Sequence, residues 1–79
     1  MEESRKYQIV DNAIRHFRET HEVIDVDGAR VLFGDGWGLI RASNTQPVLV
    51  TRYEARTEQR LAAIQGEMEQ WLRTQGVSP

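Results

Sequence analysis

The sequence contains no cysteine and no long apolar run, and both absences exclude classes of protein. Without cysteine there is no disulfide, no thiolate nucleophile and no cysteine-based zinc site, which fits a reducing environment. A membrane-spanning helix needs about 20 apolar residues in succession, and no stretch approaches that length. The acidic start MEESRK is unlike a signal peptide. We therefore expect a cytoplasmic protein without a membrane partner.

An excess of positive charge is also missing. The formal net charge is −2, from 10 lysines and arginines against 12 aspartates and glutamates. Nucleic-acid-binding domains usually carry a clear basic excess and, for single strands, an aromatic stacking platform. Neither is evident, so we expect no nucleic-acid partner, and any site for an anion must be local.

The length of 79 residues is enough for one small domain, which we place at residues 1–79. A chain this short buries only roughly 60% of its unfolded surface. A deep catalytic cleft enclosed by this chain alone is therefore not expected.

Two segments have the residue spacing of amphipathic helices. The first covers residues 2–19 and contains no glycine or proline. In the second, Thr57 is a suitable N-cap, Gly76 ends the helix, and Gly66 costs about 1 kcal/mol relative to alanine unless close packing uses the missing side chain. The expected apolar stripes are Tyr7, Val10, Ile14 and Phe17 in the first helix, and Leu61, Ile64, Met68 and Trp71 or Leu72 in the second.

Four short segments between the helices favour strands. Ile24 and Val26 alternate with aspartates, and the alternation resumes at Val31 and Phe33 after a tight turn at Asp27-Gly28. A second turn, Asp35-Gly36, precedes the strand WGLIRA (37–42), in which Trp37 and Leu39 share one side while Ile40 and Ala42 share the other. The last strand is VLVTRYEA (48–55), which is rich in β-branched and aromatic residues.

This order, α-β-β-β-β-α, predicts an α+β fold. Neither helix nor sheet can exclude water alone, so we expect a two-layer domain with a four-stranded, mainly antiparallel sheet and both helices packed on one of its faces.

The loop between the last two strands concentrates polar groups that suit a phosphate. Arg41 offers a planar fork of donors, and Ser43 and Thr45 add hydroxyls at alternate positions. Asn44 closes turns readily, and consecutive backbone N–H groups in a turn can form an anion-binding nest. No base, nucleophile or metal ligand accompanies them. The loop is either an ordinary polar turn or a site that holds a phosphate without cleaving it.

Other candidate residues have ordinary structural explanations beside the functional ones. The spacing of His16 and His21 does not bring both rings to one face, which argues against a shared metal ion. The aspartates at positions 25, 27 and 35 are more typical of hairpin turns than of a calcium site. Trp37 and Tyr53 either stack on a ligand or cover the sheet. Arg52 and Arg56 either extend the positive potential near the loop or pair with Glu54 or a neighbouring strand.

The stretch DGARVLFGDGWGLIRASNTQPVLVTRYEARTEQRL closely resembles the C-terminal domain of the α-D-phosphohexomutases, of the bacterial phosphomannomutase/phosphoglucomutase type. The resemblance is strong over about Val23 to Leu61 and extends to the flanking helices in pattern only. It implies a fold like that of the TATA-binding protein, and the fourth domain of an enzyme that interconverts 1-phospho and 6-phospho hexoses.

In that family a phosphoserine of the first domain transfers its phosphoryl group with Mg²⁺ bound by the second, and the fourth domain closes over the cleft and grips the phosphate that is not transferred. The residues carried over to this grip are Arg41, Ser43, Asn44 and Thr45. The partners implied are a mannose or glucose phosphate and the other three domains.

The family's Ser-His-Asn-Pro loop and Asp-Gly-Asp metal loop are absent from this chain. We therefore expect no catalytic residue, metal or cofactor here, and no activity of the chain alone; GDGW (34–37) is better explained as a hairpin turn. Whether the chain is an excised domain or a natural fragment, and which hexose is preferred, stay open. The alternative is a freestanding phosphate-binding or interaction module, suggested by a chain that starts at Met1 and supplies one domain.

Overall fold

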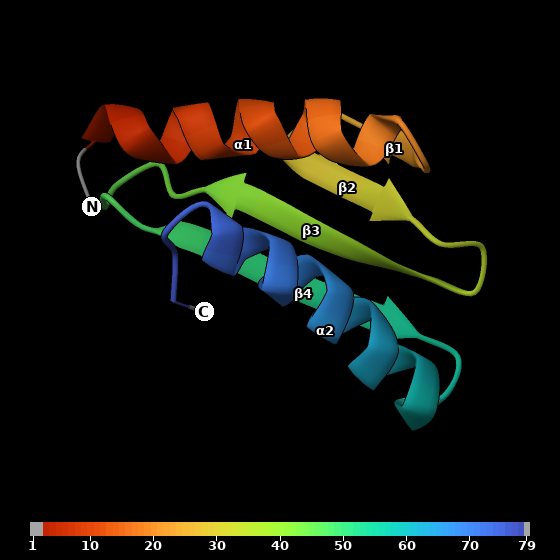
Figure 1. Ribbon diagram of the computed structural model, residues 1–79. Coiled ribbons are helices and arrows are strands. Elements are labelled where there is room, and N and C mark those ends of the chain that lie inside the picture. The colour runs from red at the N-terminus through yellow and green to blue at the C-terminus, as the bar shows by residue number, and fades with distance from the viewer. Residues whose placement is uncertain (1–2, 79) are drawn as a thin grey trace.

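The computed structural model describes residues 3–78 (Figure 1). Along the chain, one helix precedes the four strands and the other follows them. The strands pair antiparallel in the order β1-β2-β3-β4, so the sheet is a simple meander. The predicted α+β class and element order are confirmed, and no described helix is long and apolar enough to cross a membrane. The elements are α1 (Glu3–Arg18), β1 (Glu22–Ile24), β2 (Ala29–Leu32), β3 (Gly36–Ala42), β4 (Leu49–Ala55) and α2 (Glu58–Thr74).

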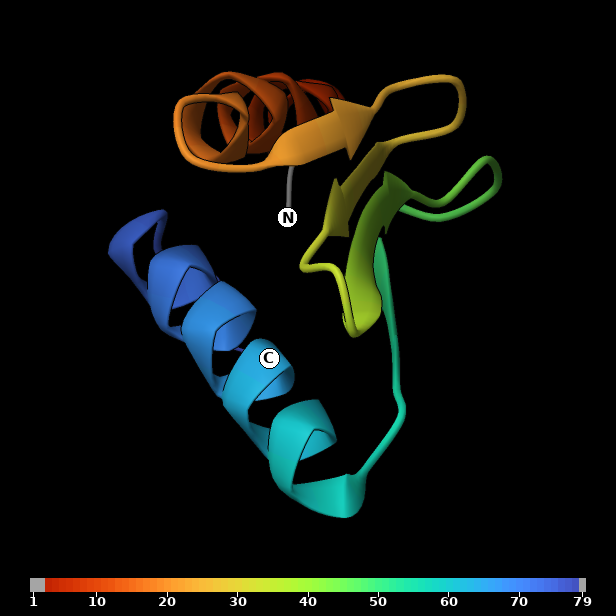
Figure 2. The ribbon, with the colours of Figure 1, turned by 90° about the vertical axis from the view of Figure 1, so that its right-hand side faces the viewer.

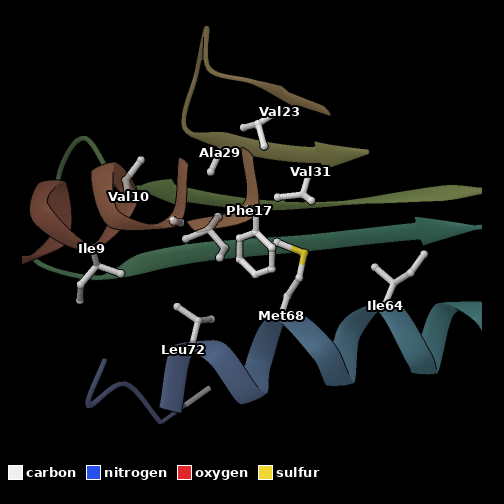
Figure 3. Close-up of a cluster of buried hydrophobic side chains, with 11 residues drawn as sticks. Ile9, Val10, Phe17, Val23, Ala29, Val31, Ile64, Met68 and Leu72 are labelled. Carbon is white, nitrogen blue, oxygen red and sulfur yellow. The ribbon is translucent and has the colours of Figure 1, made fainter. Parts of the chain in front are cut away.

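Both helices lie on the same side of the sheet, as Figure 2 shows. Helix α1 contacts β1, β2 and β3, whereas α2 contacts β3 and β4. The apolar face of α2 is turned toward the strands (Figure 3), and the two-layer prediction is confirmed. The core between the layers consists of Ile9, Val10, Ala13, Phe17, Val23, Ala29, Val31, Ile40, Ile64, Met68 and Leu72.

Close packing of α2 on the sheet depends on Gly38 at the centre of β3. A Cβ atom added there would overlap the sulfur of Met68, whose side chain is completely buried. The thioether therefore occupies the space that a larger residue would fill. By contrast, nothing lies within 4 Å of a Cβ added to Gly66, on the exposed side of α2.

The buried stripe of α1 differs from the predicted one. Val10 and Phe17 are buried as expected, but Tyr7 is 52% exposed and Ile14 is only partly buried. The actual stripe follows the helical spacing i, i+3, i+4, i+7 and i+11, and it begins with a lysine, which apolar periodicity alone does not reveal. Its members are Lys6, Ile9, Val10, Ala13 and Phe17. The predicted start of this helix at Glu2 lies outside the described residues.

The first strand also differs from its prediction. It ends at Ile24, which is 41% exposed, and Val26 lies in the turn with 90% of its surface exposed. The buried residue is Val23, which pairs with Val31 of β2. A shift of one residue moves every side chain of a strand to the opposite face, so the alternation of Ile24 and Val26 indicated the wrong face.

Both ends of α2 carry the predicted caps. The hydroxyl of Thr57 accepts a hydrogen bond from the N–H of Arg60 at 3.1 Å. At the other end Gly76 has φ of 81°, and the N–H of Val77 donates to the carbonyl of Leu72. This is the Schellman arrangement, in which a glycine takes the left-handed conformation.

The turn between β2 and β3 is fixed to the start of α2 by an ion pair that the sequence did not predict. The guanidinium of Arg60 donates to both carboxylate oxygens of Asp35, with Nε 2.6 Å from Oδ2. These hydrogen bonds hold the pKa of Asp35 below its ordinary value of 3.8. Asp35 thus joins two segments 25 positions apart, in addition to forming the expected turn.

Replacing the two glycines by alanine should change stability in opposite directions. Gly66→Ala should raise the free energy of unfolding by about 1 kcal/mol, because alanine is the better helix former and the site is open. Gly38→Ala should lower it by about 1–3 kcal/mol, because Met68 must move out of a packed core. Urea unfolding followed by circular dichroism measures both, and a stabilising Gly38→Ala contradicts the packing described above.

The ion pair should make stability depend on pH below neutrality. A lowered pKa of Asp35 in the folded state stabilises the fold above the unfolded pKa, and this contribution is lost as pH falls through the folded pKa. Asp35→Asn should therefore lower the urea midpoint at pH 7, and the difference from the unsubstituted protein should shrink below about pH 4. The exposed Asp11 provides the control because it forms no ion pair within residues 3–78, so Asp11→Asn should leave the urea midpoint nearly unchanged.

Candidate anion-binding loop

The β3–β4 loop (residues 43–48) projects from one end of the sheet, beside the turn between β1 and β2 (Figures 1 and 2). The antiparallel pairs Arg41↔Val50 and Ala42↔Leu49 lead directly into it. The N–H of Ser43 then donates to the carbonyl of Val48 at 3.0 Å. The base of the loop is therefore an extension of the strand ladder.

Inside the loop, the hydroxyl of Ser43 organises the backbone. Its oxygen accepts hydrogen bonds from the N–H groups of Thr45, at 3.4 Å, and Gln46, at 3.3 Å. A hydroxyl that accepts two bonds still has its own proton to donate. No non-glycine residue between 3 and 78 has a positive φ, so Asn44 does not use a left-handed conformation. Ser43 thus shapes the turn and keeps one donor.

The four predicted site residues occupy different positions around the loop. Asn44 and Thr45 are exposed, and Ser43 is partly buried. Arg41 is partly buried in β3, and its side chain forms no hydrogen bond or ion pair within the described part of the chain. The N–H groups of its guanidinium are therefore available to bind a ligand.

Arg41 and Asn44 line one shallow pocket of about 170 Å³, together with two carboxylates, Asp11 and Asp27. Ser43 and Thr45 do not line it. Carboxylates repel a dianion at short range, so the pocket interior is unfavourable for phosphate. The exposed rim of the loop, beside Arg41 and the polar side chains that follow it, is therefore a more suitable surface for an anion than the pocket interior.

The sheet face opposite the helices adds positive charge near the loop. Leu39 is opposite Arg30 in β2 and Arg52 in β4, and Arg41 lies two residues further along β3, on the same face. Neither Arg30 nor Arg52 forms an ion pair within residues 3–78. Of the two alternatives for Arg52, an ion pair with Glu54 or with a neighbouring strand is therefore wrong.

Trp37 is engaged by its own sheet neighbours. Its indole N–H donates to Glu54 at 3.2 Å, and the Arg30 guanidinium lies 4.4 Å from the ring centroid. It shares the open face with Leu39, as predicted, whereas Ile40 lies in the core. Trp37 therefore covers the sheet surface through contacts with adjacent strands.

Tyr53 packs against the core, on the face covered by the helices. Its hydroxyl is buried without a hydrogen-bond partner among the described residues, and burial raises its pKa above the ordinary range. Arg56 lies beyond the other end of β4, where its backbone N–H donates to Asp35. Neither residue is adjacent to the β3–β4 loop.

The two histidines contribute to packing between distant segments. His16 stacks on Trp71 of α2 with ring centroids 5.4 Å apart, and His21 lies 4.5 Å from the ring of Phe33 by the same measure. Within residues 3–78 there is no group of three or more histidines and carboxylates that could hold a metal ion.

Lys6 is the residue near the loop that the sequence analysis missed. Its ammonium nitrogen lies 2.6 Å from the carbonyl oxygen of Ser43 and 3.0 Å from that of Gln46, although helix α1 is remote from the loop in sequence. The side chain is completely buried. Its position on the buried stripe, one turn before Ile9 and Val10, is the signal that identifies it.

Comparison with known proteins supports the resemblance. Residues 1–70 match the family model for the phosphoglucomutase/phosphomannomutase C-terminal domain. Phosphoglucomutase of Neisseria meningitidis serogroup B is 44% identical over 70 residues, which cover 86% of this chain and 15% of that protein. Phosphomannomutase/phosphoglucomutase of Pseudomonas syringae pv. tomato is 61% identical over 41 residues, covering 52% of this chain and 9% of that protein.

A solved structure gives the same result. The crystal structure of a phosphoglucomutase/phosphomannomutase family protein from Burkholderia thailandensis aligns with a TM-score of 0.68 and 38% identity, over 84% of this chain and 16% of that one. The chain therefore spans less than a fifth of the length of each of these relatives.

Removing the Ser43 hydroxyl should loosen the loop without unfolding the sheet. In Ser43→Ala the N–H groups of Thr45 and Gln46 lose their acceptor, so their hydrogen exchange should accelerate while that of β3 stays unchanged. Amide exchange followed by NMR measures this. Thr45→Val is the matched control, since its backbone N–H keeps the bond to Ser43; equal acceleration in both variants contradicts the role of the serine.

Proposed function

The chain belongs to the phosphoglucomutase/phosphomannomutase family as its C-terminal domain, and from this premise we propose that it binds the non-transferred phosphate of a hexose phosphate. The observation that carries the proposal is Arg41, a guanidinium without a partner in the described chain, at the base of a loop rich in hydroxyl and amide groups. The longer enzyme would interconvert 1-phospho and 6-phospho hexoses by intramolecular phosphoryl transfer.

Each proposed contact uses a donor that the loop leaves available. Arg41 supplies a charged fork that matches two phosphate oxygens. The hydroxyl oxygen of Ser43 accepts two backbone hydrogen bonds, and its O–H group is still able to donate one to the phosphate. Asn44 and Thr45 are exposed and supply an amide and a hydroxyl. All four groups can donate hydrogen bonds to an anion.

The proposed role of this domain is to bind the non-transferred phosphate and to close the active-site cleft of the longer enzyme. A domain that holds the remote phosphate of a sugar fixes the position of the reacting end and excludes water when it moves over the cleft. The loop suits this role because it is anchored at both ends in paired strands. Its groups hold a phosphate and do not activate a nucleophile, so we propose that this chain alone has no mutase activity.

Metal chemistry belongs, on this proposal, to another part of the longer enzyme. Among residues 3–78 there is no group of three or more histidines and carboxylates that could hold a metal ion. The phosphoserine, the Mg²⁺ ion and most sugar contacts are accordingly proposed for domains beyond this chain. The cytoplasmic location expected from the cysteine-free sequence is part of the same proposal.

Titration of the ¹⁵N-labelled chain with glucose 1-phosphate or mannose 6-phosphate tests the proposal. We expect weak binding, with the largest NMR shifts between Arg41 and Thr45, and no such shifts with unphosphorylated glucose. Arg41→Ala should weaken binding by about 10-fold or more, because hydrogen bonds to charged groups contribute about 1.5–3 kcal/mol.

Arg56 supplies the matched control, since it is an exposed arginine beyond the opposite end of β4. Arg56→Ala should leave the affinity within about twofold, as expected for a distant surface charge screened by salt. An equal loss of affinity in Arg41→Ala and Arg56→Ala would show that binding depends only on general charge attraction and would contradict a specific role of Arg41. Shifts scattered evenly over the chain would reject the loop as the site.

A further inference from the structure

We propose that Lys6 is a positioning residue for phosphate binding, whose buried ammonium group holds the β3–β4 loop in its binding shape. This inference rests on the function proposed above, and it concerns a residue on a different element from the loop. The three contacts of the Lys6 ammonium nitrogen carry the argument.

The ammonium group has three N–H donors, and three oxygen atoms surround it. Two are the carbonyl oxygens of Ser43, at 2.6 Å, and Gln46, at 3.0 Å. The third is a carboxylate oxygen of Glu3, also at 2.6 Å, one turn earlier in α1. A buried charge is tolerated only when it is paired and hydrogen-bonded, and here every donor has an acceptor.

Lys6 acts on the loop and does not contact the ligand itself. Its side chain is 0% exposed, so a phosphate on the outer rim of the loop cannot reach it. The negative charge of Glu3 also lies beside the ammonium, which cancels much of its long-range attraction for an anion. The carboxylate raises the pKa of Lys6 above its ordinary value of 10.5, so the ammonium stays charged at neutral pH.

The effect on the loop follows from peptide geometry. The carbonyl and the N–H of a trans peptide point in opposite directions, and there is no cis peptide among the described residues. When Lys6 draws the Ser43 carbonyl inward, the N–H of Asn44 points outward, and it has no partner within residues 3–78. One buried cation thereby leaves a backbone N–H available on the loop, three residues after Arg41.

The same cation also fixes the far side of the loop. The carbonyl of Gln46 accepts bonds from both Lys6 and the N–H of Val48, at 3.0 and 2.8 Å. The following Pro47 has no N–H and a fixed φ, and it is the central residue of the tight turn that the bond from Val48 closes. The loop is therefore held at positions 43 and 46, on either side of the exposed Asn44 and Thr45.

Lys6→Met tests this role, because methionine keeps much of the side-chain length but supplies no donor. In the ligand-free protein we expect the amide NMR signals of residues 43–46 to move toward random-coil values, and the affinity for inorganic phosphate to fall at least 10-fold. Arg5→Met is the matched control. Arg5 is the adjacent cation on α1 and also donates to a backbone carbonyl, that of Gln75 at the end of α2.

Arg5→Met should lower the thermal midpoint yet leave the loop signals and the phosphate affinity unchanged, which separates positioning from general stabilisation. If Lys6→Met keeps the ligand-free loop signals, the inference is wrong whatever happens to the affinity. If the unsubstituted protein binds no phosphate, the proposed function fails instead, and the ligand-free signals still report whether Lys6 shapes the loop.

A second measurement on the unsubstituted protein applies even if Lys6→Met does not fold. The ¹⁵Nζ signal of Lys6 should be protected from exchange with water, and inorganic phosphate should shift the loop amides without shifting that signal. A Lys6 signal that shifts as much as the loop amides would make the lysine a direct ligand of the phosphate. Rapid exchange of its N–H protons with water would overturn the buried arrangement.

Discussion

The arrangement of this molecule depends on the packing of both helices against a single face of the sheet. Successive side chains of a strand point to opposite faces of the sheet. In a sheet covered on one side, one set of side chains is therefore buried under the helices (the dry face) and the other faces solvent. Met68 over Gly38 brings α2 close to the dry face, and α1 covers the rest. The opposite face and the strand ends are not covered by the helices, and Arg41 and its loop lie there.

Local signals in the sequence were sufficient for much of this fold. The turn at Asp27-Gly28, the Thr57 cap and the glycine stop at Gly76 each depend on residues a few positions apart. The division of β3 into two faces was predicted for the same reason. The second turn lies one residue before its predicted place, at Gly34 and Asp35, and Gly36 already belongs to β3. The position of the loop at a strand end, with Arg41 leading into it, also followed from the order of the strands.

The features that escaped prediction join distant parts of the chain. Asp35 and Arg60 are 25 positions apart, and each alone is an ordinary surface residue. The buried face of β1 was predicted wrongly because the register of this strand is set by its pairing with β2. A strand of three residues is too short for alternating hydrophobicity to identify its buried face. Lys6 was overlooked because it is charged and precedes the apolar residues of its stripe. Its partners in the loop are backbone carbonyls, which no sequence pattern identifies.

The strand order in space follows the strand order along the chain, and this has a consequence for the time course of folding. Sheets built from successive hairpins need only short loops to close, which favours rapid formation. The contact between Lys6 and Ser43 is different, because it spans 37 positions and requires α1 to be docked on a finished β3. The loop should therefore acquire its shape among the last events of folding, after the sheet is complete.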